Sequence, residues 1–147
     1  MNSPATKKDA QIALNKLKSF IGPAQIAAVK QGIRGEERQF FFDKLVELAT
    51  IIEFMPKLAE QGKPADEMMI HLRYFAGGQA NFYIMEKDIG WEGDKPEQFQ
   101  SQTFGLADLF GDGGELGYIS IPEILANGGE LDFYFQPCTL AQLRAKK

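Results

Sequence analysis

The chain has 147 residues, of which 44% are hydrophobic and 24% are charged, a size and composition typical of one domain with one main core. Its single cysteine, Cys138, and single histidine, His71, exclude an intramolecular disulfide, a cysteine zinc cage and the two-histidine zinc motif. The chain starts without the apolar stretch of a secretory signal, and no run approaches the ~20 apolar residues of a membrane helix. We therefore expect a soluble protein of the reducing cytoplasm, with no membrane contact.

The net charge of -4 is distributed unevenly along the chain. Up to Lys63 there are 10 basic and 7 acidic residues, whereas from Pro64 onward there are 6 basic and 13 acidic residues. An acidic second half repels nucleic acid and favours a basic protein partner, a cationic ligand or a metal. The same charges would also suit a sheet face that is simply solvated, so both interpretations stay open at this point.

The first half predicts helices. The first segment has apolar residues at helical spacing, with Thr6 and Asp9 as a capping pair and Gly22 as the stop. Pro23 is suited to the first turn of a second helix, which Gly32 would end.

A third and longer helix is predicted to begin near Gly35 and to end or kink at Pro56. Its apolar stripe comprises Phe40, Phe41, Leu45, Leu48, Ile51 and Ile52. We expect a single domain, 1–147, with a helical part (1–55), a connector (56–66) and a sheet part (67–147).

Beyond the connector the apolar period changes from about 3.6 to 2. Residues 68–75 predict a strand whose even positions are apolar and cover the helical stripe, and a hairpin leads into a second strand at 82–88. Further strands are predicted at 103–106, 116–121 and 131–135, with a tight turn at Asp112-Gly113. Short helices are predicted at 122–127 and after Thr139.

These elements predict an α+β fold, in which two or three N-terminal helices pack on one face of a five-stranded, mainly antiparallel sheet with a short C-terminal helix. We expect the segments 115–123 and 131–136 to mark the centre of this sheet. In the fifth strand, Leu131, Phe133 and Phe135 should face the core.

One set of residues in the second half occurs in a distinctive order: Tyr74-Phe75, 82–86 with Asp88, 103–105, 115–121 with Glu123, and 131–135 with Pro137 and Leu140. In this set the chain resembles a family of small proteins carried by plasmids, phages and integrative elements, the domain of unknown function 2958. The resemblance covers about half of the chain, with Phe82-Tyr83 where the family usually has Trp-Tyr. It implies genomic association with mobile elements, which often carry proteins that blunt host defence, and it supplies no activity.

Residues 89–101 predict a long loop, which holds Trp91, Glu92, Asp94 and Glu97. Trp91 would either anchor a partner or fold back onto the sheet, because large aromatic side chains usually find cover. We expect the partner surface in the acidic half, with this loop at its edge.

Several carboxylates and tyrosines are candidates for chemistry. Glu86 and Asp88 lie two apart on a predicted strand, where a metal or a buried acid would explain their repulsion, although the strand could also be leaving the core there. Glu115 flanks the turn at Asp112, a position that backbone bonding alone explains. A shallow pocket for an anionic or planar ligand would form if the tyrosines gathered with His71 and Arg73; otherwise they pack under the helices. The tyrosines concerned are Tyr83, Tyr118 and Tyr134.

No nucleophile–base pair and no metal cluster can be assembled from these motifs, and no cofactor is predicted. The sequence therefore favours a non-enzymatic binding protein with a protein partner, acting as a mobile-element accessory factor that modulates a host defence protein. The alternative is a small metal-dependent or carboxylate- and tyrosine-using enzyme for a nucleotide-like anion, which requires Glu86, Asp88 or Glu115 to converge.

Overall fold

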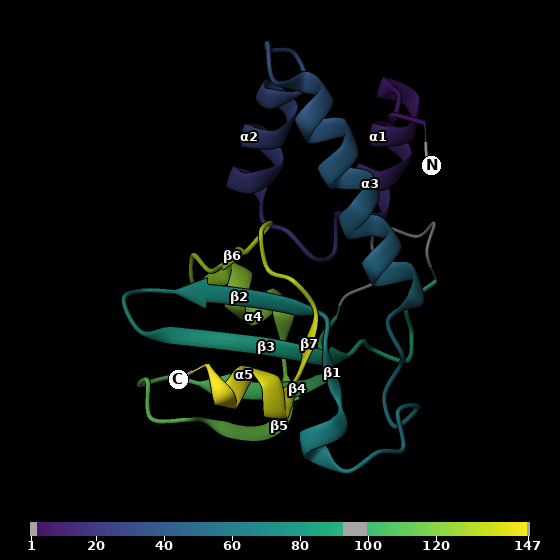
Figure 1. Ribbon diagram of the computed structural model, residues 1–147. Coiled ribbons are helices and arrows are strands. Elements are labelled where there is room, and N and C mark those ends of the chain that lie inside the picture. The colour runs from purple at the N-terminus through teal and green to yellow at the C-terminus, as the bar shows by residue number, and fades with distance from the viewer. Residues whose placement is uncertain (1–2, 93–99, 147) are drawn as a thin grey trace.

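The computed structural model describes residues 3–92 and 100–146, and within them the helical first half and the sheet second half are as predicted (Figure 1). The helices are α1 (Lys7–Leu17), α2 (Pro23–Gly32), α3 (Arg38–Phe54), α4 (Ile121–Ala126) and α5 (Leu140–Ala145), with a 3₁₀ turn at Ala65–Glu67. None of these helices combines the length and apolarity that crossing a bilayer requires.

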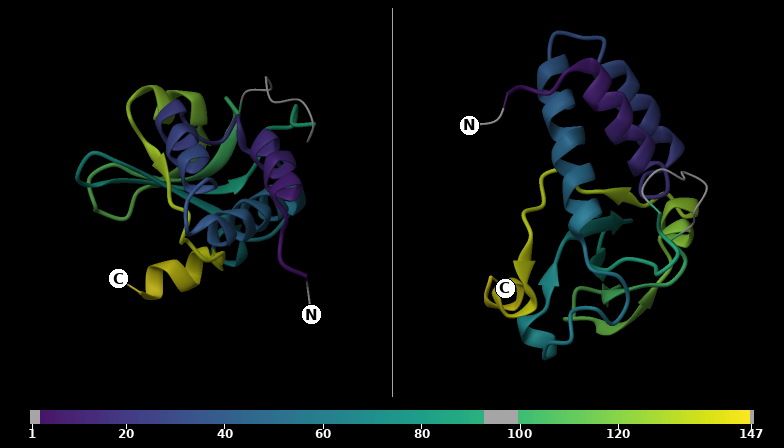
Figure 2. Two further views of the ribbon diagram at one scale, coloured as in Figure 1. Left: turned by 90° about the horizontal axis from the view of Figure 1, so that it is seen from above. Right: turned by 90° about the vertical axis from the view of Figure 1, so that its right-hand side faces the viewer.

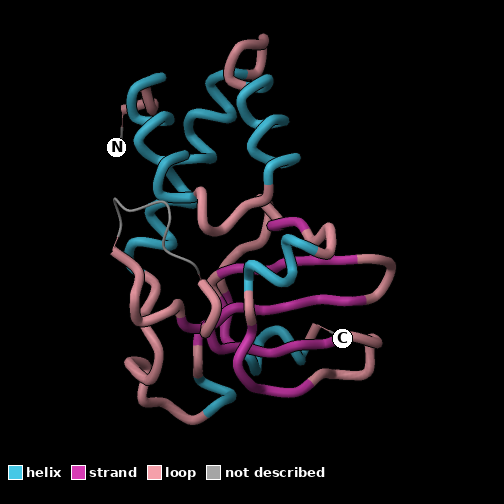
Figure 3. The backbone as a smooth tube through the Cα atoms, turned by 180° about the vertical axis from the view of Figure 1, so that it is seen from behind, coloured by secondary structure: helices cyan, strands magenta, loops and turns pink. Residues whose placement is uncertain are grey.

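The main sheet has five antiparallel strands in the order β5-β4-β3-β2-β6, which confirms the α+β fold. Its strands are β2 (Leu72–Ala76), β3 (Ala80–Glu86), β4 (Thr103–Asp108), β5 (Glu115–Ile119) and β6 (Glu130–Leu131). A separate two-stranded ladder joins β1 (Met69–Ile70) to β7 (Cys138–Thr139). The back view in Figure 3 shows α4 lying across the main sheet.

The N-terminal helices form as their local signals predict. Thr6 and Asp9 make a reciprocal capping box at the start of α1. Pro23 is the first residue of α2, and Gly32 is its last. The three helices stand together above the β2 and β6 side of the sheet, a group that we call the helical lobe (Figures 1 and 2).

The apolar stripe of α3 differs from the predicted one at its N-terminal end. The buried side chains are Phe42, Leu45, Leu48, Ala49 and Ile52, whereas Phe40 is exposed. The helix begins at Arg38, later than predicted, and the phase that buries Leu45 and Ile52 also turns Phe42 inward. Phe42 was therefore missed because three consecutive phenylalanines fit more than one helical phase.

The helical lobe and the sheet share a cluster of buried side chains. Leu45 and Ile52 of α3 belong to the same cluster as Leu72 and Tyr74 of β2. The Tyr74 hydroxyl donates a hydrogen bond of 2.5 Å to the carbonyl oxygen of Phe20, in the segment between α1 and α2. This buried bond ties the lobe to the sheet.

A second, smaller cluster fills the opposite face of the sheet. It joins Tyr83 and Met85 of β3 and Leu106 of β4 to Leu140 and Leu143 of α5. Figure 2 shows α4 and α5 on opposite sides of the sheet. The sheet is thus covered on one face by α4, which lies between β5 and β6 in the chain, and on the other by α5.

The predicted strand at 68–75 is broken at His71. Ile70 lies in the cluster under α5, whereas Leu72 lies in the cluster shared with the lobe. The two residues belong to different ladders, because β1 pairs with β7 and β2 pairs with β3. The even positions therefore do not form one face, and Leu72 and Tyr74 alone meet the helical lobe.

The segments predicted for the centre of the sheet form its two edges instead. β5 is one edge, and β6, only two residues long, is the other. After β6, the Asp132 carboxylate accepts a hydrogen bond from the backbone N–H of Tyr134, which turns the chain out of the sheet. Phe133 then packs against the lobe-side cluster and Phe135 against the other, so the predicted central strand at 131–135 is wrong.

Candidate protein-binding surface

Glu86 supports the connector and is not open to a ligand. Its buried carboxylate accepts hydrogen bonds from the backbone N–H groups of Ala59, at 3.0 Å, and Gln61, at 3.1 Å. Ala59 has a left-handed backbone, with φ of 68°, which a non-glycine residue adopts only when its surroundings hold it there. Of the explanations considered for this pair, the buried acid therefore applies to Glu86.

Asp88 likewise organises backbone. One carboxylate oxygen accepts from the N–H of Gly90 and the other from the N–H of Gln102, both at 2.9 Å. Asp88 lies beyond the end of β3, after an irregularity between Ile84 and Glu86, so the expected common face is not formed. Across residues 3–92 and 100–146, no three His, Cys, Asp or Glu side chains gather in a way that could hold a metal ion.

The three carboxylates required by the enzyme alternative do not converge. Glu86 lies opposite Phe104 on β4, whereas Glu115 lies opposite Ala107. Three residues along a strand correspond to roughly 10 Å, and Glu115 is one strand further away. The Glu86 carboxylate is also held under the connector by its two backbone bonds.

Trp91 folds back into the core, with 7% of its surface exposed. Its ring lies 3.7 Å from the Lys87 ammonium, which donates to the carbonyl oxygens of Ile52, at 2.6 Å, and Glu53 at the end of α3. Burial, partly offset by the charge of Glu53, lowers the pKa of Lys87 from its usual 10.5 to about 8. Trp91 therefore folds back over the end of α3, which is the second of its two predicted alternatives, and it is not an exposed partner anchor.

Of the other residues predicted in this loop, Glu92 is exposed beside Trp91. Asp94 and Glu97 lie outside the described residues.

The three candidate tyrosines occupy three different places. Tyr83 is buried against Phe135 under α5, and Tyr134 is exposed and stacks on Phe40 of the helical lobe. Tyr118 is exposed on β5. The expected aromatic and basic pocket is therefore not formed.

The two basic residues expected in that pocket are also engaged or buried. The Arg73 guanidinium donates to the side chains of Asn81 and Asp132, the latter at 2.8 Å. Burial, with the nearby charge of Lys87, lowers the pKa of His71. Neither side chain faces a tyrosine cluster.

The β6 edge is closed by a side chain that imitates a neighbouring strand. The Gln25 amide nitrogen donates to the carbonyl oxygen of Leu131, and the Gln25 amide oxygen accepts from the Leu131 N–H, both at 2.9 Å. Gln25 belongs to α2, so the helical lobe itself covers this edge. Among the described strands, none pairs with the outer side of β5, which lies at the far end of the sheet from the lobe (Figure 1).

Exposed apolar side chains gather along the open β5 edge. Leu116 and Tyr118 lie on one face of β5, opposite Leu106 and Phe104 of β4. Tyr118 is 75% exposed and meets the Phe104 ring edge-on, with 6.3 Å between the ring centres. Leu109 and Phe110, the latter 73% exposed, begin the loop between the strands. We call Leu109, Phe110, Leu116 and Tyr118, together with the exposed Glu115 at the start of the strand, the β5 surface.

The loop between β4 and β5 presents part of this surface. The buried Asp108 carboxylate accepts from the N–H groups of Gly111 and Asp112, which curls the chain after Phe110. At Gly114, with φ of 73°, an added side chain would lie 2.5 Å from the Ala107 carbonyl oxygen. The loop is therefore held from both of its ends, and it is longer than the predicted tight turn.

Two adjoining hollows follow the β5 edge, with volumes of about 400 and 300 Å³. Both are bordered by Leu109 and Tyr118; the first extends along the loop to Glu115, and the second runs to Glu123 and Asn127 on α4. Apolar side chains and carboxylates line these hollows together. This combination is suited to a partner that offers apolar and basic groups together.

Among the described residues, the charged side chains that border the two hollows all have negative charge. From Gln100 to Leu143 the chain has six acidic residues and no Lys, Arg or His. Asp112, Glu115 and Glu123 border the two hollows. This stretch without basic residues, together with the apolar pair Leu109-Phe110 before a glycine-rich turn, was the sequence signal for the β5 surface. Of the predicted site residues, Glu115 and Tyr118 belong to it.

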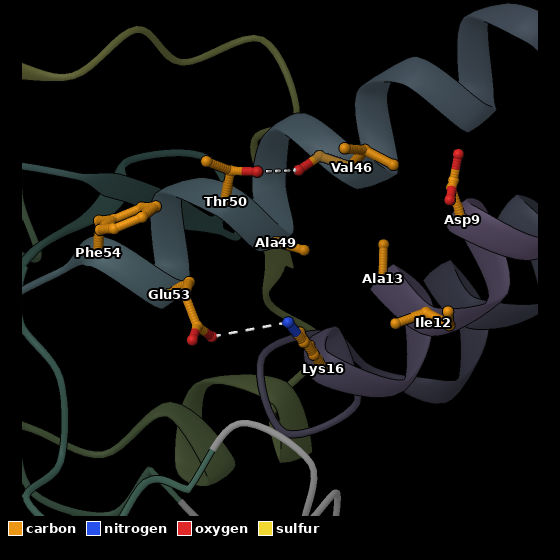
Figure 4. Close-up of a pocket in the computed structure, with 9 residues that line it drawn as sticks. All are labelled: Asp9, Ile12, Ala13, Lys16, Val46, Ala49, Thr50, Glu53 and Phe54. Carbon is orange, nitrogen blue, oxygen red and sulfur yellow. Dashed lines mark hydrogen bonds and ion pairs between the residues drawn. The ribbon is translucent and has the colours of Figure 1, made fainter. Parts of the chain in front are cut away.

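A smaller cavity of about 220 Å³ lies between α1 and α3 (Figure 4). Its apolar wall includes Ile12 and Phe54, and Lys16 spans it through an ion pair with Glu53 at 3.7 Å. Acidic and basic groups are both present, so the cavity has no charge preference of the kind seen at β5.

No family model, no curated protein and no solved structure matches this chain. Function is therefore inferred from the geometry and charge of the described residues.

Proposed function

We propose that this chain is a non-enzymatic binding protein and that the β5 surface, within the acidic second half, binds a basic protein partner. The observation that supports the proposal is the coincidence of three features at one place: exposed apolar side chains, a strand edge with which no described strand pairs, and hollows whose charged lining residues are all acidic. Negative charge accelerates the encounter with a basic partner, and a desolvated aromatic side chain such as Tyr118 supplies affinity.

The absence of basic residues makes this edge unusual. Proteins commonly protect exposed strand edges from pairing with lysines, short strands or covering helices. β6 is both short and covered, whereas β5 has five residues, with no lysine or arginine among them or within ten positions of them in the sequence. Carboxylates such as Glu115 disfavour the approach of a second acidic copy while they favour a basic protein.

The biological setting of the proposal comes from the resemblance to the domain of unknown function 2958. We extend the proposal accordingly to a mobile-element accessory factor that acts in the cytoplasm on a host defence protein. The proposal at this level is supported by the resemblance alone, and the binding surface itself does not depend on it.

Site-specific photo-crosslinking tests the proposed surface. A photoreactive phenylalanine is placed at Tyr118, which is 75% exposed, and at Phe54, which is 80% exposed on the helical lobe and serves as the matched control. In cells of the native host, we expect the probe at Tyr118 to capture a basic protein, identified by mass spectrometry.

Charge neutralisation completes the test. Glu115→Gln combined with Glu123→Gln should reduce capture at Tyr118, because both carboxylates border the hollows beside β5. Equal capture at Phe54 and Tyr118, or capture that does not respond to these changes, would contradict the proposal.

A further inference from the structure

We propose that the partner contributes an extended segment in which apolar and basic residues alternate, and that this segment binds as a sixth strand beside β5. The inference rests on the proposed function and specifies its mode of recognition. Strand addition to an exposed sheet edge derives affinity from backbone hydrogen bonds and specificity from alternate side chains.

The backbone of β5 is available for such pairing. Glu115–Ile119 pairs on one side with β4, and no other described strand pairs with it. The opposite edge of the sheet, by contrast, is closed, because Gln25 bonds to both the N–H and the carbonyl oxygen of Leu131 there. No comparable side-chain bond is made to the backbone of 115–118 within residues 3–92 and 100–146; at Ile119 the carbonyl accepts from Thr103 of β4.

One face of β5 is apolar and the other is acidic, so the two faces together favour a partner strand in which apolar and basic side chains alternate. Leu116 and Tyr118 lie on the face that β5 shares with Phe104 and Leu106. An added strand would place every second side chain beside them, where an apolar residue would bury more of their exposed area.

The other face of β5 is acidic and open. It carries Glu115 and Gly117, and an added side chain at Gly117 would meet nothing within 4 Å. Glu123 of α4 borders the hollow on this side, together with Ile119. The remaining side chains of an added strand would therefore point toward carboxylates and space, which suits lysine or arginine.

A peptide of about eight residues in which lysine and valine alternate, with both ends blocked, is the probe. Calorimetric titration at low salt should show binding to the full chain, and binding should weaken at high salt. A peptide with glutamate in place of lysine should not bind. Lack of binding by the lysine–valine peptide would overturn strand addition.

Backbone methylation of the peptide separates strand pairing from simple charge attraction. Neighbouring N–H groups of a strand point to opposite sides, so methylating the valine nitrogens and methylating the lysine nitrogens remove different rows of donors. One methylated peptide should bind like the parent, and the other should lose about tenfold or more in affinity. Equal affinity of both methylated peptides would overturn the inference.

The binding site on the protein is tested with two exposed tyrosines. Tyr118→Ser should weaken peptide binding about tenfold, whereas Tyr134→Ser, whose side chain is 70% exposed beside Phe40, should leave it unchanged. Bound peptide should also slow amide hydrogen exchange within Glu115–Ile119. Equal effects of the two changes, or unaltered exchange in β5, would contradict the inference.

The results separate this inference from the proposed function. Crosslinking at Tyr118 in the host without binding of the lysine–valine peptide would leave the partner surface standing and remove strand addition. Peptide binding at β5 without any crosslinked partner would support strand addition and remove the proposed partner in the host. A dimer detected by sedimentation and abolished by Tyr118→Ser would assign the edge to a second copy of the chain and would overturn the inference.

Discussion

The five-stranded sheet ends in β6 on one side and in β5 on the other, and the two edges differ in length, cover and charge. β6 has two residues and lies under the helical lobe, where Gln25 occupies the place of a neighbouring strand. β5 has five residues, carries exposed Leu116 and Tyr118, and has carboxylates around it. One edge is thus part of the folded core, while the other has the features of a binding surface.

This difference shows where stability and function are separated in the molecule. Side chains near β6 hold the lobe and the sheet together through buried contacts, and changes there should unfold the protein. Side chains on the outer part of β5 contribute little to folding, and changes there should leave stability intact. Matched substitutions at the two ends test this division directly.

The largest difference is expected between two tyrosines. Tyr74 is fully buried and bonded to Phe20, so Tyr74→Ala should lower the free energy of unfolding by roughly 3–5 kcal/mol. Tyr118→Ala should lower it by less than about 0.5 kcal/mol, because that side chain is exposed. Urea unfolding followed by circular dichroism measures both. Comparable losses would mean that β5 is part of the core.

Two glycines that face each other across β4 and β5 provide the second comparison. A side chain at Gly105 would lie 1.9 Å from the Tyr83 carbonyl oxygen, so Gly105→Ala should cost about 1–3 kcal/mol or more. Gly117→Ala meets nothing within 4 Å and should be neutral or slightly stabilising. Thermal unfolding of the two variants gives the comparison. Strong destabilisation by Gly117→Ala would show that this side of β5 is already covered.

The closure of the β6 edge is tested by removing the Gln25 side chain, which takes the place of a neighbouring strand. Gln25→Ala removes two hydrogen bonds to Leu131 and should cost about 1–2 kcal/mol, with faster hydrogen exchange at the Leu131 amide. Gln11→Ala, at an exposed position in α1, is the matched control and should change neither quantity. Unaltered exchange at Leu131 in the Gln25 variant would mean that the edge is closed by something other than this amide.

The smallest expected effect is the pH dependence of the free energy of unfolding that Lys87, bonded at the end of α3, produces. The pKa of Lys87 is lowered to about 8, whereas an unfolded lysine keeps its proton to about pH 10.4. Between these values the unfolded chain binds more protons, so the free energy of unfolding should rise with pH, by on the order of 1 kcal/mol per pH unit.

The useful window for this measurement runs from about pH 8 to pH 9.5. Above it Tyr74 acts in the opposite direction, because burial raises its pKa and ionisation would favour unfolding. Urea unfolding across the window should show a rise for the natural chain and a flat profile for Lys87→Met. A rise of the same size in the Lys87→Met variant would assign the pH dependence to another group.

Local signals in the sequence predicted the elements well because their causes are local. Thr6 and Asp9 form the capping box of α1, and Thr139 caps α5 through a bond to residue Gln142. Gly77, with φ of 57°, lies in the turn of the predicted β2–β3 hairpin. Each of these interactions joins residues only a few positions apart, so the residue types suffice to specify it.

The site could be predicted only in part, because contacts across the chain decide which polar and aromatic residues remain exposed. Tyr118 and Glu115 were identified and belong to the β5 surface, whereas Trp91 was assigned to an interface and is buried over Lys87. The role of Glu86 depends on Ala59 and Gln61, which lie 27 and 25 positions away. No spacing within one strand contains that information.

By itself, the sequence determined the order of the helices and of strands β2 to β5, the caps of α1 and α5, and the negative charge of the second half. The tertiary structure alone decided which strands became edges, which edge the helical lobe covered, and on which face each apolar residue was buried. Strand order and register follow from hydrogen bonds and burial between distant segments, whose energies depend on the whole arrangement. Leu131 and Leu116 are both leucines at the edges of one sheet, and only the position of Gln25 and the helical lobe makes one core and the other surface.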